Sequence, residues 1–186
     1  MGTLNFIDEN GMKQGKWEFY YKNGTLKQVG SFKDGMKQGE WKRYHVNRVL
    51  SQIGSYKDDK KQGQWKDYHL TEQLVRVSSY KDGKRDGEDK KFYFSGKLRE
   101  VVNYKNGRKR DYKWYDNNGQ LGEIGSFKGG KRHGEWKIFH SNGNLEVLTN
   151  YDNEGNMEDM TFYDKDGEFM RCVDYKNLDE NGALIC

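Results

Sequence analysis

The sequence predicts an all-β protein, built as an elongated, open antiparallel β-ribbon of about seven β-hairpin repeats. Three observations support this fold class. Aromatic residues and leucines recur at steps of 24 residues, with a single step of 23. Asn-Gly, Asp-Gly or Ser-Gly pairs stand where most hairpin turns are expected, because such turns need positive φ angles. Proline is absent, which suits strands whose N–H groups are all needed in a sheet.

Each repeat begins with a strand that is marked by tryptophan and tyrosine. The tryptophan row consists of Trp17, Trp41, Trp65 and Trp136, with Asp89, Tyr112 and Met160 at the same position in the other copies. The tyrosine row includes Tyr20, Tyr44 and Tyr68, followed by Phe92, Tyr115, Phe139 and Tyr163. A fixed period indicates one structural unit per period. We therefore expect both rows to be structural.

A turn at Asn23-Gly24 joins this strand to the second strand of the repeat. A two-residue type I′ turn would place Tyr21 opposite Leu26 and Trp17 opposite Gly30. The indole of Trp17 would then lie over Gly30, and one face of the sheet would carry the following side chains: Trp17, Phe19, Tyr21, Leu26 and Phe32. We expect no helix, because no 3.6-residue periodicity persists along the chain.

The repeats predict a single domain over residues 1–186. Residues 1–10 would form an N-terminal half-repeat or cap, and residues 11–153 the regular repeats. Residues 154–186 would form a degenerate, acidic C-terminal repeat and cap. A hairpin of this size has no core of its own, so each repeat would depend on its neighbours.

The composition limits the class of protein. Hydrophobic residues make up 33% of the chain, but aromatic residues reach 15% and the net charge is only +4, which argues against disorder. No apolar run approaches the length of a membrane helix, about 18 residues. The first residues show no signal-peptide pattern, and the alternative of a signal peptide that has already been removed is kept. Cys172 and Cys186 form no metal-binding spacing, and this sparse cysteine content predicts a reducing, cytoplasmic location.

The sequence contains no pattern that predicts catalysis, a cofactor or a metal site. His45 and His69 share a repeat position, but equivalent residues of adjacent hairpins are expected about 9.6 Å apart, and no third ligand is evident. Acidic residues recur evenly beside the tryptophan row, whereas an active site would be unique in a repeat array. We therefore predict that the protein is not an enzyme.

Charge is unevenly distributed and suggests two alternative binding sites. Residues 146–186 carry a net charge of −8, against +12 for residues 1–145. An acidic surface could bind a basic partner through Asp152, Glu154, Asp164, Asp166 and Asp174; alternatively, this region is a polar capping repeat. A basic row could bind an acidic partner through Lys33, Lys57, Lys81, Lys105 and Lys128, or could protect a long sheet edge. A second basic row, which begins with Lys13 and Lys37, is expected in the loops between repeats.

The repeat unit resembles that of a known family. The resemblance is carried by Gly15, Trp17, Tyr20, Asn23-Gly24, Leu26 and then Phe32-Lys33-Asp34-Gly35. This pattern is similar to the MORN-repeat variant family, over roughly residues 11–176. The resemblance implies a rigid antiparallel β-ribbon that binds other macromolecules. Its bacterial members include antitoxins of the YwqK type, which implies toxin neutralisation. Asp89 and Arg110 depart from the pattern near the middle of the chain.

These observations predict a non-catalytic, protein-binding repeat scaffold, with a role in bacteria as an antitoxin or immunity protein whose partner is a toxin. One alternative is a carbohydrate or cell-wall binding module, in which exposed tryptophans and tyrosines stack on sugars. Another is binding to an anionic lipid surface through the lysine rows. No nucleic-acid partner is expected, because acidic residues are interleaved with the lysines.

Overall fold

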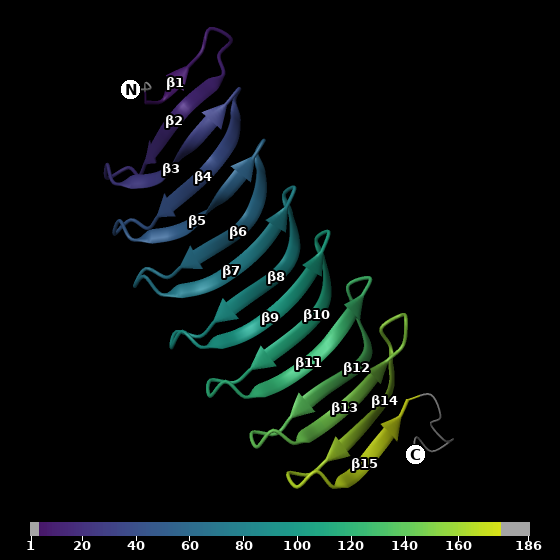
Figure 1. The fold of residues 1–186 in the computed structure, drawn as a ribbon. Coiled ribbons are helices and arrows are strands. Elements are labelled where there is room, and N and C mark those ends of the chain that lie inside the picture. Colours follow the sequence, from purple (N-terminus) through teal and green to yellow (C-terminus); the bar gives the residue numbers. More distant parts are fainter. Residues whose placement is uncertain (1–3, 176–186) are drawn as a thin grey trace. The chain divides into compact units, whose positions relative to one another are not determined.

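The computed structural model describes residues 4–175. These residues belong to two compact units, one ending at Gly96 and the other beginning at Lys97. All regular structure in the described part of the chain is β-strand (Figure 1). The described residues therefore contain no helix that is long and apolar enough to cross a membrane.

Strands of eight or nine residues dominate both units. The first unit contains β1 (Phe6–Ile7), β2 (Lys13–Tyr20), β3 (Leu26–Lys33), β4 (Met36–Tyr44), β5 (Leu50–Lys57), β6 (Lys60–Tyr68), β7 (Leu74–Lys81) and β8 (Lys84–Phe92). The second unit contains β9 (Leu98–Lys105), β10 (Arg108–Tyr115), β11 (Leu121–Lys128), β12 (Lys131–Phe139), β13 (Leu145–Tyr151), β14 (Met157–Tyr163) and β15 (Phe169–Asp174).

Within each unit, every strand pairs antiparallel with the strands that precede and follow it in the chain. The predicted all-β fold class, an open antiparallel sheet of hairpin repeats, is confirmed. Within residues 4–175, seven repeats of two strands are preceded by one additional strand, β1, whose Phe6 pairs with Gln14 of β2.

The hairpin turn differs from the predicted two-residue type I′ turn. The N–H of Tyr21 donates to the carbonyl of Thr25 (2.8 Å), and the N–H of Gly24 donates to the carbonyl of Tyr21 (2.9 Å). Gly24 has a φ of 80°, whereas Asn23 is not among the residues with positive φ. The turn is therefore a three-residue loop, in which a type I turn is followed by a left-handed glycine.

This longer loop changes part of the predicted register. Tyr20, not Tyr21, lies opposite Leu26, and the register then shifts between Phe19 and Tyr20. The shift restores the predicted pair of Trp17 and Gly30. It also places Leu26 on the face of Tyr20, so the prediction that Leu26 shares the face of Trp17 was wrong.

The core of the first unit contains indoles that lie on glycine backbone. Trp41 and Trp65 are 1% and 2% exposed. A Cβ atom at Gly30 would overlap the indole of Trp41, and one at Gly54 would overlap that of Trp65. Each indole thus covers the glycine of the preceding hairpin. The indole over Gly30 is that of Trp41, which corrects the predicted place of Trp17.

Copies without tryptophan lack this glycine. Ser78 pairs with Asp89, and both are 2% exposed. The other pairs are Val102 with Tyr112 and Thr149 with Met160. A side chain at the glycine position fills the space that an indole would occupy, so the two positions change together.

Candidate functional site

The face that carries the tryptophan row, called here the aromatic face, is used for packing. In the first unit, Phe32 contacts Trp41 edge-on at 5.0 Å between ring centroids, and Tyr56 contacts Trp65 in the same way at 4.9 Å. In the second unit, Trp136 is 3% exposed and contacts Phe127 at 5.2 Å. The indoles of these copies are therefore closed to solvent.

Cations cover this face. The Nζ atoms of Lys37 and Lys61 lie 4.8 Å and 4.1 Å from the ring centroids of Trp41 and Trp65. Burial lowers the pKa of Lys37 from its usual value. This second basic row was predicted to lie in the loops between repeats, but its residues lie within strands and pack on the rings by cation–π contact.

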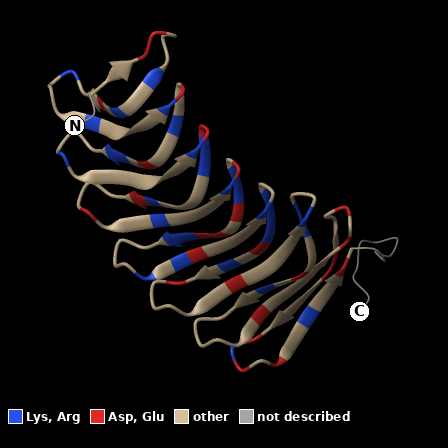
Figure 2. Ribbon diagram, turned by 45° about the horizontal axis from the view of Figure 1, so that its top comes forward, with Lys and Arg blue, Asp and Glu red and all other residues tan. Residues whose placement is uncertain are grey.

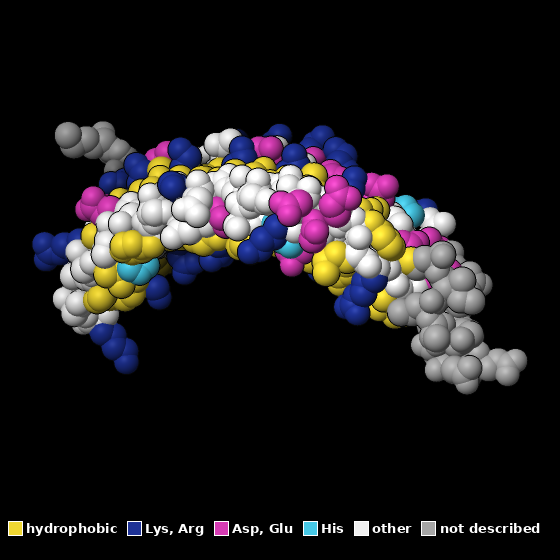
Figure 3. All heavy atoms as spheres, turned by 90° about the horizontal axis from the view of Figure 1, so that it is seen from below, with side chains coloured by type: hydrophobic (Ala, Val, Ile, Leu, Met, Phe, Trp, Pro, Cys, Tyr) yellow, Lys and Arg dark blue, Asp and Glu magenta, His cyan; other side chains and the backbone are white. Residues whose placement is uncertain are grey.

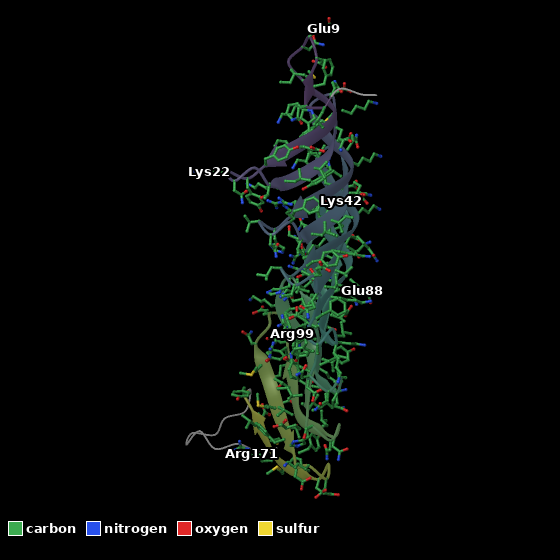
Figure 4. All side chains as sticks on the ribbon, turned by 90° about the vertical axis from the view of Figure 1, so that its left-hand side faces the viewer. Glu9, Lys22, Lys42, Glu88, Arg99 and Arg171 are labelled. Atoms are coloured by element: carbon green, nitrogen blue, oxygen red, sulfur yellow. The ribbon has the colours of Figure 1, made fainter. Side chains whose placement is uncertain are left out.

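The opposite face, called here the tyrosine face, carries the tyrosine row. Tyr20 is 52% exposed, and Tyr44 and Tyr68 are half-buried. Ion pairs between acidic residues and lysines two positions apart recur on this face: Lys16–Glu18, Lys42–Glu40, Lys90–Glu88 and Lys137–Glu135, at 2.6 to 2.9 Å. Lys42 and Glu88, which are labelled in Figure 4, belong to two of these pairs. The tyrosine face thus presents both charges at each of these repeats.

The predicted lysine row lies along the turns that connect one repeat to the next. Its five residues end strands and are exposed: Lys33, Lys57, Lys81, Lys105 and Lys128. The structure pairs most of them with another cation across the turn, as in Lys57 with Lys60 and Lys81 with Lys84. Acidic residues such as Asp58 and Asp82 stand within the same turns, and Figure 2 shows both charges at these strand ends.

The five acidic residues of the predicted C-terminal site are not gathered in one place. Asp152 and Glu154 lie in the turn before β14, whereas Asp164 and Asp166 lie in the turn after it. The seven residues of β14 separate these two turns by about 23 Å. Asp174 pairs with Asp159, nearer to the first turn.

Two of these aspartates hold their own turns together. The carboxylate of Asp152 accepts hydrogen bonds from the N–H groups of Glu154 and Asn156, each at 2.8 Å. Hydrogen bonds from Asn156 lower the pKa of Asp152. Asp164 accepts in the same way from the N–H groups of Asp166 and Glu168.

Histidines of the shared repeat position link consecutive hairpins. The Nε2 atom of His45 lies 3.0 Å from the carbonyl oxygen of Tyr68, and that of His140 lies 3.0 Å from the carbonyl oxygen of Tyr163. In the described residues, no group of three His, Cys, Asp or Glu side chains could hold a metal ion. Cys172 of β15 is disulfide-bonded.

Sequence reasoning missed a row of apolar side chains at the hairpin turns. Val46, Leu70 and Phe94 begin the turns of the second, third and fourth repeats, and all three are more than half exposed. The equivalent residues of the other repeats are polar: Lys22, Asn117, Ser141 and Lys165. An alignment of the turns by the 24-residue period would have revealed the row, because the three apolar residues share one repeat position.

Comparison with known proteins supports the repeat assignment. The model of the MORN repeat variant family matches residues 13–34, 85–106, 111–128 and 132–153. No curated protein matches the chain. The crystal structure of TcdB2-TccC3-Cdc42 is similar at 12% identity over 90% of this chain and 12% of that chain, with a TM-score of 0.24. A score this low carries no argument about fold or function.

Proposed function

Since this chain carries repeats of the MORN variant family, we propose that it is a scaffold that binds another protein. Repeats of this family generally form non-catalytic binding scaffolds. The finer role that we propose is the one implied by the family resemblance, neutralisation of a bacterial toxin by direct binding.

The observation that carries the proposal is the different use of the two faces and the edges. The aromatic face is occupied by its own packing, since Trp41, Trp65 and Trp136 are at most 3% exposed. The tyrosine face and the turns instead present exposed side chains of both charges at regular spacing. A surface of mixed charge suits a protein partner, whose own surface carries both charges.

The same observations do not favour the two alternative ligands. A sugar would have to stack on an exposed ring, but the indoles of Trp41 and Trp65 are buried and covered by cations, which limits such stacking to exposed rings of the tyrosine row such as Tyr20. An anionic lipid surface would meet acidic residues such as Asp82 beside the lysine row. Neither a row of fully exposed rings for a sugar nor an unbroken row of cations for an anionic lipid is therefore present on these surfaces of the described residues.

The test is to co-express the full chain with the product of the adjacent gene and to measure their complex by light scattering and calorimetry. We expect a stable complex of fixed stoichiometry, and loss of the partner's toxicity when both proteins are present. Absence of a complex, together with saturable binding to soluble polysaccharide or to vesicles with phosphatidylserine, would overturn the proposal.

A further inference from the structure

Three consecutive hairpin turns of the first unit expose an apolar side chain. The side chains of Val46, Leu70 and Phe94 are 58%, 51% and 62% exposed. Each is the first residue of its loop, directly after the histidine or tyrosine that ends the paired segment. Apolar residues that are exposed by chance are scattered over a surface, whereas these three occupy the same position in neighbouring repeats. Such a regular row of exposed apolar side chains indicates an interaction surface.

The same turns hold two charged residues in a strained backbone conformation. Arg48 and Glu72 have φ angles of 71° and 70°, in the left-handed region. Glycine occupies this turn position in the remaining repeats: Gly24, Gly96, Gly119, Gly143 and Gly167. An L side chain in this region is strained where glycine is not. Strain retained in two neighbouring turns points to a use for these side chains.

A surface hollow separates the second and third turns. It is lined by Asn47, Arg48, Val49, Leu50, Tyr68 and Glu72. Val49, Leu50 and Tyr68 supply its apolar part. Arg48 and Glu72 supply one charge of each sign. A similar hollow between the first and second turns is lined by Leu26 and Tyr44, and again by Arg48. Figure 3 shows hydrophobic side chains reaching the surface between charged ones.

We propose that the turn ridge, defined as Val46, Leu70 and Phe94 with Arg48 and Glu72, docks an amphipathic helix of a partner protein. The proposal rests on the proposed function and names the surface and the partner element.

A helix suits the ridge because the turn backbone is already hydrogen-bonded. The N–H of Arg48 donates to the carbonyl of His45 (2.9 Å), and that of Glu72 donates to the carbonyl of His69 (3.0 Å). An extended peptide would find no strand edge here, whereas a helix satisfies its own backbone. Successive hairpins are about 9.6 Å apart. Two helical turns rise about 10.5 Å, so apolar residues at every seventh position of the helix would meet the ridge.

The charges favour a protein over a membrane. Arg48 would pair with an acidic residue of the partner helix. Glu72 would pair with a basic residue of that helix, about one repeat spacing away from the acidic one. An anionic lipid surface would be attracted by Arg48 and repelled by Glu72. The partner helix is therefore expected to carry both charges beside its apolar stripe.

The test uses the full chain and a synthetic, fluorescein-labelled peptide. The peptide spans three heptads, with leucine at every seventh position, glutamate placed to face Arg48 and lysine placed to face Glu72. We expect saturable binding by fluorescence anisotropy. The double variant Leu70→Ser with Phe94→Ser should bind about tenfold more weakly or worse, because it loses apolar contacts. Phe169→Ser is the matched control, since Phe169 is 61% exposed on another hairpin, and it should bind as the wild type does.

Two further variants separate binding from folding. Arg48→Gly with Glu72→Gly relieves the left-handed strain, so its thermal midpoint should rise by about 2–4 °C while peptide binding weakens. Arg48→Glu with Glu72→Arg should prefer a peptide whose charges are exchanged. A purely structural role for these side chains would instead lower the midpoint in the glycine variant and leave the charge preference unchanged, which would overturn the proposal.

Other outcomes also overturn it. The first is equal peptide binding by the Leu70→Ser, Phe94→Ser variant and the Phe169→Ser control. The second is a dimer of the wild type that this double variant abolishes. The third is vesicle binding that depends on the turn ridge, in the absence of peptide binding. The product of the adjacent gene separates this proposal from the proposed function. If that protein binds all variants alike, the proposed function holds and the ridge is wrong. If the peptide behaves as expected and that protein binds none of them, the ridge holds and toxin neutralisation is wrong.

Discussion

At the scale of single residues, the fold depends on pairs formed by a tryptophan and the glycine 11 positions before it. Gly30 lies under Trp41, Gly54 under Trp65, and Gly125 under Trp136. The requirement is steric: the indole occupies the space that a Cβ atom would need. While the tryptophan is present, this glycine cannot be replaced without displacing the indole.

Gly54→Ala should destabilise the protein by about 1–3 kcal/mol, because the added methyl group overpacks the indole of Trp65. Urea unfolding of the wild type, Gly54→Ala, Trp65→Ala and the double variant measures the coupling. Once Trp65 is replaced by alanine, the same methyl group should cost little. Equal costs in both backgrounds would show that the indole does not impose the glycine.

At the scale of elements, strands β7 and β8 replace this apolar pair with a buried ion pair. The guanidinium of Arg76 donates to both carboxylate oxygens of Asp89, at 2.8 and 2.5 Å, and Arg85 lies 3.4 Å from the same carboxylate. Removing Asp89 from water is costly, and its partners offset this cost only while they stay in place. The repeat is thus held by a set of side chains that must change together.

Copying the residues that stand 24 positions earlier in the sequence should stabilise the chain at this ion pair. The triple variant Arg76→Gln, Ser78→Gly and Asp89→Trp copies Gln52, Gly54 and Trp65, and replacing a buried ion pair by apolar packing contributes up to about 1–4 kcal/mol. Asp89→Trp alone should destabilise, since it meets the Cβ atom of Ser78 and leaves Arg76 without its partner. Urea midpoints that place the triple variant below Asp89→Trp would contradict this account.

The turns are elements with a pH dependence of their own. Hydrogen bonds from Asn156 and from turn N–H groups lower the pKa of Asp152 below its usual value of 3.8. A lowered folded-state pKa contributes stability above the unfolded pKa, and this contribution is lost as pH falls through the folded pKa. Asp152→Asn keeps an acceptor oxygen but does not titrate. The stability difference between wild type and Asp152→Asn, measured by thermal unfolding, should therefore shrink as pH falls below about 4. A stability difference between the two proteins that stays constant from pH 7 to pH 3 would contradict a stabilising role for the ionised Asp152.

At the scale of the whole molecule, the sequence predicted the features that repeat and failed where single residues decide. The strands follow from aromatic rows in a fixed period. The turn type does not follow, because Asn23-Gly24 fits both a two-residue turn and a three-residue loop with a left-handed glycine. The acidic site was predicted from closeness in sequence, but the strand between Asp152 and Asp164 separates them. The exposed row with Leu70 was missed because one apolar residue in one turn carries no signal.

The repeat architecture predicts that damage stays local. Trp136 contacts Tyr112, Phe127 and Tyr151, all within the second unit. In a repeat array, stability is carried by each repeat and its nearest neighbours. Trp136→Ala, which removes a buried indole worth about 3–5 kcal/mol, should therefore weaken β11–β13 first.

Hydrogen–deuterium exchange of the full chain measures this directly. In Trp136→Ala, amide protection in β11–β13 should fall by about two orders of magnitude or more, while β3–β5 keep the protection of the wild type. Trp41→Ala is the matched control and should give the reverse pattern, because Trp41 is buried among rings of the first unit. If either substitution lowered protection equally in all strands, the two units would unfold together. The nearest-neighbour description would then be wrong for this chain, and the buried indoles would stabilise the whole molecule rather than their own repeats.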